Sequence, residues 1–165
     1  MVWVIEDARL GVQPIATTST TQNHPLGTRV KANHETYRGG EFIYLSGVAS
    51  TVVGSAVLII PDGHTTTLLN ADDIGAVGFA MSINDAATDY GWYQIYGKAV
   101  GKVLSGFADD GRCYATSTSG SLDDAVVDGD LVHNCLGASA IDTPSTGLAE
   151  LEIAYPYCDD IAGND

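Results

Sequence analysis

Apolar and polar residues alternate along most of this chain, and no long stretch has the three-to-four-residue spacing of an amphipathic helix. β-Branched residues and glycines dominate, and turn signals recur at short intervals, which is typical of an all-β protein. We therefore expect an antiparallel β-barrel or sandwich, with an extended N-terminal arm and at most one or two short helices. The pattern predicts nine strands, over residues 27–32, 41–48, 55–60, 65–69, 76–83, 91–104, 112–116, 131–136 and 148–155.

Turn residues mark several of the connections between these strands. Pro61-Asp62-Gly63 lies between two apolar runs and predicts a β-hairpin. Residues 109–111 and 127–130 predict two more turns, and residues 84–90 suggest a loop with one helical turn. Ser121 would cap a short helix over residues 121–127, with Asp123 and Asp124 in its first turn.

The segment over residues 91–104 has the most regular alternation in the chain. One of its faces is small and apolar, and we expect this face to pack inward. The other face carries two aromatic residues and two of the seven Lys and Arg residues. Aromatic side chains are enriched at subunit interfaces, although an amphipathic surface strand is the alternative. The candidate interface residues are Trp92, Tyr96, Lys98 and Lys102.

The first 26 residues are interpreted as an extended arm that a partner orders. A Thr/Ser run favours extended backbone, Pro14 and Pro25 oppose a helix, and Glu6 and Asp7 argue against a signal peptide. The alternative is a disordered terminus. The body, residues 27–157, is expected to fold without the arm, and residues 158–165 form an acidic tail. The candidate partner-binding residues of the arm are Trp3, Val4, Ile5, Thr17, Thr18, Thr20 and Thr21.

The charge of the chain excludes one class of partner. The 165 residues form one domain with a net charge of −14, and residues 113–165 contain ten acids and no Lys or Arg. Such a chain repels phosphate backbones, so nucleic-acid binding is not expected. Residues 42–61 carry no charge, but their glycines and serines favour two strands over a membrane-spanning helix.

No residue pattern indicates a cofactor, a metal site or an active site. The four histidines lack metal-ligand spacing, and the sequence contains no nucleophile elbow, Walker loop or dinucleotide fingerprint. Adjacent acidic pairs point to opposite faces of a strand, which makes them poor acid–base partners. Cys113, Cys135 and Cys158 are expected to be buried, reduced thiols, as in a protein made in a reducing cytoplasm.

Four segments of the sequence resemble structural proteins of tailed bacteriophages. The first two are Arg-Leu-Gly at residues 9–11 and Gly-Glu-Phe-Ile-Tyr-Leu-Ser-Gly-Val-Ala-Ser at residues 40–50. The other two are Gly-Trp-Tyr-Gln-Ile-Tyr-Gly-Lys-Ala at residues 91–99 and Ala-Ile-Asp-Thr-Pro at residues 140–144. Over roughly residues 9–160 the chain is similar to head decoration, or cement, proteins.

The resemblance implies a non-enzymatic protein, often a homotrimer, on the outer surface of the virion. Its partner would be the major capsid protein, and it would clamp neighbouring capsomers after synthesis in the bacterial cytoplasm. Two alternatives remain open. One is a head–tail connector or tail component, which would form a ring of different subunit number. The other is a carbohydrate-binding β-sandwich that uses Trp92 and Tyr96 as sugar platforms.

Overall fold

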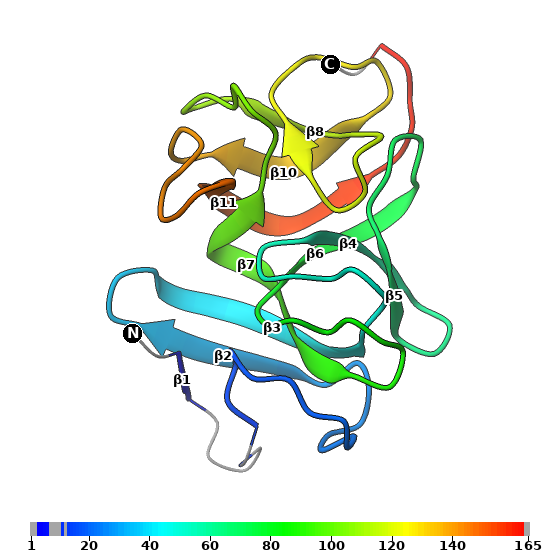
Figure 1. Ribbon diagram of the computed structural model, residues 1–165, viewed down its shortest axis with the longest axis vertical. Coiled ribbons are helices and arrows are strands. Elements are labelled where there is room, and N and C mark those ends of the chain that lie inside the picture. Colours follow the sequence, from blue (N-terminus) through cyan, green and yellow to red (C-terminus); the bar gives the residue numbers. More distant parts are fainter. Residues whose placement is uncertain (1–2, 7–10, 12, 164–165) are drawn as a thin grey trace.

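The computed structural model describes residues 3–6, 11 and 13–163, and this part of the chain is an all-β structure without helices (Figure 1). Its strands form one antiparallel sheet that is not closed, with β1-β2-β3-β7-β6-β11-β10-β8-β9 as its main path and β4 and β5 beside β6. The strands are β1 (Val4–Ile5), β2 (Arg29–His34), β3 (Arg38–Ser46), β4 (Ala56–Ile60), β5 (Thr65–Leu68), β6 (Gly75–Ala80), β7 (Tyr90–Lys102), β8 (Arg112–Ala115), β9 (Leu122–Asp123), β10 (Leu131–Gly137) and β11 (Leu148–Cys158).

In Figure 1 the molecule has a lower half, which contains β2 and β3, and an upper half, which contains β10 and β11, and strand β7 runs from one to the other. Its first half pairs with β3, and its second half pairs with β11. The change occurs at Gly97, whose backbone φ is +100°. A Cβ atom at this position would lie 2.5 Å from the carbonyl oxygen of Gly39, so the close approach of the two strands requires glycine.

Three strands meet at the junction of the two halves. Strand β6 pairs with β7 at Phe79 and Ala80 and with β11 at Gly75 and Ala76. Strands β7 and β11 also pair with each other, so each of the three contacts the other two. The sheet therefore folds back on itself at this point, and strands from the two halves lie against one another.

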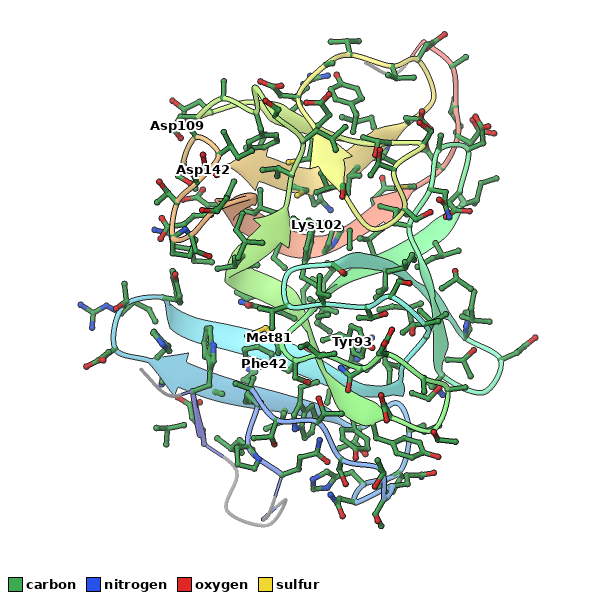
Figure 2. The ribbon with its side chains drawn as sticks, in the orientation of Figure 1. Phe42, Met81, Tyr93, Lys102, Asp109 and Asp142 are labelled. Atoms are coloured by element: carbon green, nitrogen blue, oxygen red, sulfur yellow. The ribbon has the colours of Figure 1, made fainter. Side chains whose placement is uncertain are left out.

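The apolar side chains gather in three clusters. The largest one is built mainly from β6, β8, β10, β11 and the second half of β7, and it includes Phe79, Phe107, Leu151 and the three cysteines. The other two lie one on each face of β3 and the first half of β7. Phe42 and Tyr93, which belong to these two clusters, both lie in the lower half of Figure 2. The start of β7 is therefore buried on both faces.

Most of the predicted elements are present. Each of the nine predicted strands coincides with one of the strands β2–β8, β10 and β11, within a few residues at the ends. The hairpin at Pro61-Asp62-Gly63 connects β4 to β5, which pair with each other. The uncharged residues 42–61 form most of β3, a loop and β4, as the two-strand interpretation required. Within the described residues, no helix has the length and hydropathy needed to cross a membrane.

The helix predicted over residues 121–127 is wrong. Leu122 and Asp123 instead form β9, which pairs with Ala115 and Tyr114 of β8. Leu122 is fully buried in the largest apolar cluster, and Ser121 is buried beside it rather than exposed as a helix cap. Burial of Leu122 outweighs the local capping preference. The loop over residues 84–90 contains turns but no helix.

Candidate interaction surface

The N-terminal segment packs on the protein's own body. Trp3 is 8% exposed and Ile15 is fully buried, in the cluster that covers one face of β2, β3 and β7. The Trp3 ring lies 4.8 Å from the ring of Phe42 and 5.0 Å from that of His34, between centroids. Trp3 is thus a core residue of this chain, and its predicted role in partner binding is wrong.

Backbone and side-chain hydrogen bonds also fasten this segment. Val4 and Ile5 form β1 on the edge of β2. The Gln13 carbonyl accepts a 3.1 Å hydrogen bond from Trp92 Nε1, and Gln13 Oε1 accepts a 2.7 Å hydrogen bond from the Tyr44 hydroxyl. The division into a separate arm and an independent body from residue 27 is therefore a correction: the described part of residues 1–26 completes the core.

Within the Thr/Ser run, Ser19 forms a β-bridge with Tyr90 of the same chain. The Ser19 amide and carbonyl form two backbone hydrogen bonds with Tyr90, of 3.0 and 2.8 Å. Thr17 Oγ1 donates to the Pro14 carbonyl over 2.9 Å, and Thr18 Oγ1 donates to the Ile83 carbonyl. At Ser19, an internal bridge therefore joins the segment that was expected to bind a partner to the protein's own strand β7.

Five candidate residues of the segment remain accessible. Val4 is 63% exposed, and Thr17, Thr18, Thr20 and Thr21 are exposed. Ile5 is partly buried against the same core cluster as Trp3. A role of Val4, Thr17, Thr18, Thr20 and Thr21 in partner binding stays a prediction.

The candidate interface residues on β7 differ in their exposure to solvent. Trp92 is fully buried, because the N-terminal segment covers the face that alternation placed outside. Its proposed roles at a subunit interface and as a sugar platform are therefore wrong. Tyr96 is 47% exposed and remains available.

The two lysines of this strand have different surroundings. Lys98 Nζ lies 2.5 Å from Glu150 Oε2 and 5.8 Å from the centroid of the Tyr37 ring, so the chain itself satisfies this cation. Lys102, near the end of β7 in the upper half (Figure 2), lines a hollow with the exposed side chains of Val52, Val53 and Ile83. Of the two lysines, Lys102 therefore keeps the position expected for an interface residue.

A second group of exposed apolar side chains lies on β7, β10 and β11. It consists of Tyr96, Leu136, Tyr155 and Tyr157, whose exposed fractions are 42–49%. We call these four residues the tyrosine surface. The rings of Tyr96 and Tyr155 are 5.4 Å apart between centroids, and Tyr157 stacks on His133 at 4.7 Å.

Three adjoining hollows follow the tyrosine surface. The first, of about 240 Å³, has an apolar lining that includes Ile43, Ile59 and Ile95, and Tyr155 and Tyr157 also line it. The second contains Tyr155 and Tyr96 together with Lys31 and Glu41. The third contains Tyr96 and Leu136 together with Asn134 and Glu152. Because neighbouring hollows share Tyr155 or Tyr96, they form one continuous surface.

The backbone at Tyr155 directs its side chain onto this surface. Its φ is +53°, in the left-handed region that non-glycine residues rarely adopt. This conformation interrupts the alternation of β11, so that Ala154 and Tyr155 are both exposed and Pro156 is buried. The Tyr155 hydroxyl donates a 2.7 Å hydrogen bond to Glu41 Oε2. This hydrogen bond raises the pKa of Tyr155.

Sequence reasoning missed Tyr155, Tyr157 and Leu136. The available signal was Tyr-Pro-Tyr at residues 155–157, since a proline inside a strand marks an edge or a bulge. Alternation alone does not show that this bulge lies beside Tyr96. That juxtaposition depends on the pairing of Ala154 with Tyr96 between β11 and β7.

The thiols are not part of any exposed site. Cys113, Cys135 and Cys158 are free and buried, which confirms the expectation of buried thiols. A hydrogen bond with Cys113, together with burial, raises the pKa of Cys135, and burial raises the pKa of Cys158 to about 12. Neutral, buried thiols are poor nucleophiles. Within residues 3–6, 11 and 13–163, no group of three or more His, Cys, Asp or Glu side chains is arranged to hold a metal ion.

Comparison with known proteins leaves the surface as the main guide to function. The chain matches no protein-family model, no curated protein and no solved structure.

Proposed function

We propose that this protein is a capsid decoration protein, which binds the outer surface of a bacteriophage head and stabilises contacts between capsomers. The observation that carries the proposal is the distribution of accessible groups. Exposed apolar side chains at Val52, Val53 and Ile83 line one accessible hollow with Lys102, whereas the thiols are buried. Such a molecule is suited to binding rather than to covalent chemistry.

The sequence resemblance supports the same function. Two of the segments that resemble phage structural proteins lie in neighbouring strands. Residues 40–50 span most of β3 and the loop after it, and residues 91–99 lie in β7. These two strands are hydrogen-bonded neighbours at the centre of the sheet. The resemblance thus includes a pair of strands that the fold brings together.

A cement protein works by adding contact area across capsomer boundaries. A stable protein–protein contact buries about 1,600 Å² in total, and several such contacts oppose the outward pressure of packaged DNA. A homotrimer would match the threefold positions of an icosahedral shell. The net charge of −14 favours a neutral or basic capsid surface and keeps the free protein soluble.

The test is binding to purified, expanded capsids that lack the protein. We expect co-sedimentation, density on the outer shell at symmetry-related positions by electron cryo-microscopy, and a higher temperature of capsid disruption. Density confined to a single vertex, or to the tail, would favour the connector or tail alternative. Absence of binding to any particle component would reject a virion role.

A further inference from the structure

We propose that the tyrosine surface is a binding site for neutral saccharides, a function that goes beyond capsid decoration and does not depend on it. All three exposed tyrosines of the eight in the chain lie on this surface. Tyrosine rings supply rigid, amphipathic contact area at a low cost in conformational entropy. A sugar ring combines an apolar face with a rim of hydroxyl groups, and a surface of this kind can match both.

The left-handed backbone at Tyr155 positions one ring of this surface. A left-handed conformation at a non-glycine residue costs conformational energy, and such conformations concentrate at ligand sites. Here it places the Tyr155 ring beside Tyr96, and the hydrogen bond to Glu41 fixes the orientation of the hydroxyl. The ring is therefore held in position before any ligand arrives, which reduces the entropy lost on binding.

The charges on this surface favour an uncharged ligand. Arg29 lies 3.7 Å from Glu41, and Lys98 forms an ion pair with Glu150, so these two cations have partners in the chain. The third cation, Lys31, is exposed in the second hollow, where the carboxylates of Glu6 and Glu41 also line the wall. Glu152 is exposed in the third hollow and adds negative charge. Anionic glycans would meet this carboxylate and a chain of net charge −14.

The same surface offers hydrogen-bonding groups suited to hydroxyls. Asn134, exposed in the third hollow, presents both a donor and an acceptor. The carboxylate of Glu152 accepts hydrogen bonds in the same hollow, and Glu41 lines the second one. A neutral saccharide laid across the two hollows would contact Tyr96, which both share.

A polypeptide partner fits the surface less well. Strand addition is excluded at its centre, because β7 pairs with β3 and β11, and β11 pairs with β7 and β10. The exposed apolar side chains are also interleaved with Lys98 and Glu152, whereas the centre of a protein interface is depleted in charged residues.

The experiment begins with the whole protein on an array of neutral and acidic oligosaccharides. The strongest ligand is then titrated by isothermal calorimetry against the wild type and three variants. Tyr96→Ala and Tyr157→Ala each remove one ring, and Tyr155→Asn removes a ring while keeping a residue that tolerates positive φ. Each should weaken binding at least about tenfold, which corresponds to about 1.4 kcal/mol.

Two controls separate the site from general effects. Val53→Ala and Val126→Ala shorten exposed apolar side chains away from the tyrosine surface and should bind like the wild type. Tyr157→Phe keeps the ring and should bind within about threefold of the wild type, a change below 1 kcal/mol. Circular dichroism establishes that every variant is folded.

Three outcomes would overturn the proposal. They are absence of binding to any neutral saccharide by the folded protein, preference for acidic glycans, and unchanged affinity in all three tyrosine variants. Loss of capsid binding in these variants, without saccharide binding by the wild type, would assign the surface to a protein partner instead.

Discussion

At the scale of single residues, Trp3 is the residue whose role the structure changes most. Its ring fills a cluster with Phe42, His34 and Tyr37, and it joins the first residues of the chain to β2 and β3. A large aromatic side chain in such a cluster contributes both apolar burial and ring contacts. The adjacent Val4 is 63% exposed and contributes little to this core.

The first prediction compares these two neighbours. Trp3→Ala should lower the free energy of unfolding by about 3 kcal/mol, because it leaves a cavity in an apolar cluster. Val4→Ala should change it by less than about 0.5 kcal/mol, as is usual for exposed positions. Urea denaturation measures both values. Equal effects of the two substitutions would contradict the placement of Trp3 in the core.

The second prediction concerns two histidines in the same half of the molecule. Burial lowers the pKa of His24 and of His34 from the ordinary value of 6.5. The unfolded chain therefore binds more protons than the folded one just below pH 6.5, and folding stability must fall as the pH falls through that window. Thermal unfolding between pH 7.5 and about pH 5 should show a decreasing midpoint, above the range in which most carboxylates titrate.

A double variant tests the origin of this pH dependence. His24→Gln with His34→Asn removes both imidazoles and should flatten the slope between pH 7.5 and about pH 5. Asn at position 34 can still accept the hydrogen bonds that His34 Nδ1 accepts from the amides of Thr36 and Tyr37. If the double variant keeps the slope of the wild type, other groups cause it.

At the scale of elements, the bend in β7 organises the fold. One strand serves both halves because Gly97 allows its backbone to pass close to Gly39. The register shift against β3 between Glu41 and Phe42 lies at the same place. A bulge of this kind changes the direction of a strand and increases its local twist. Gly97 therefore controls how the two halves meet.

The third prediction uses a glycine with the same dihedral angle as a control. Gly97 and Gly106 both have a φ of +100°, but nothing lies within 4 Å of a Cβ atom built at Gly106. Gly106→Ala should cost about 1–2 kcal/mol from backbone strain alone. Gly97→Ala should cost a further 1–3 kcal/mol because the Cβ atom meets backbone. Equal free energies of unfolding for the two variants would remove the close contact as a determinant of the bend.

At the scale of the whole molecule, the N-terminal segment and the body share one apolar cluster. The segment covers one face of β2, β3 and β7, and Gln13 satisfies the polar groups of Trp92 and Tyr44 beneath it. Removal of the segment would expose these aromatic side chains and leave buried donors without partners. The body is therefore not expected to be stable on its own.

The fourth prediction follows from this shared packing. A variant that lacks residues 1–26 should show a lower midpoint of thermal unfolding and increased binding of a hydrophobic dye. A milder variant, Gln13→Ala, should lose about 1–3 kcal/mol, since it removes the acceptor that the Tyr44 hydroxyl uses. A truncated protein as stable as the full chain would show that the segment is dispensable for the fold.

The fifth prediction concerns self-association. If the protein forms a trimer, Lys102→Glu should weaken it more at low than at high salt, because Lys102 lines an accessible hollow. Lys98→Glu should act on the monomer instead, through the ion pair with Glu150, and by no more than about 1 kcal/mol since the pair is partly exposed. Analytical ultracentrifugation at two salt concentrations separates the two effects. A monomer under all conditions would reject the trimer.

Local sequence patterns determined the elements of this protein. Alternation and turn residues depend on neighbours within a few positions, so they placed nine strands and the hairpin at Pro61-Asp62-Gly63. The burial of the cysteines followed from residue chemistry in the same way. These features require no knowledge of distant contacts.

Tertiary structure alone decided which faces are covered and which side chains meet. Alternation divides β7 into two faces, but it does not reveal that the N-terminal segment covers the one that bears Trp92. Likewise, Tyr96 and Tyr155 come together only through the pairing of β7 with β11. The alternation of apolar and polar residues reflects the local geometry of a strand. Whether a face is buried depends instead on which other segments pack against it. The accessible surface of this protein is therefore a property of its long-range contacts.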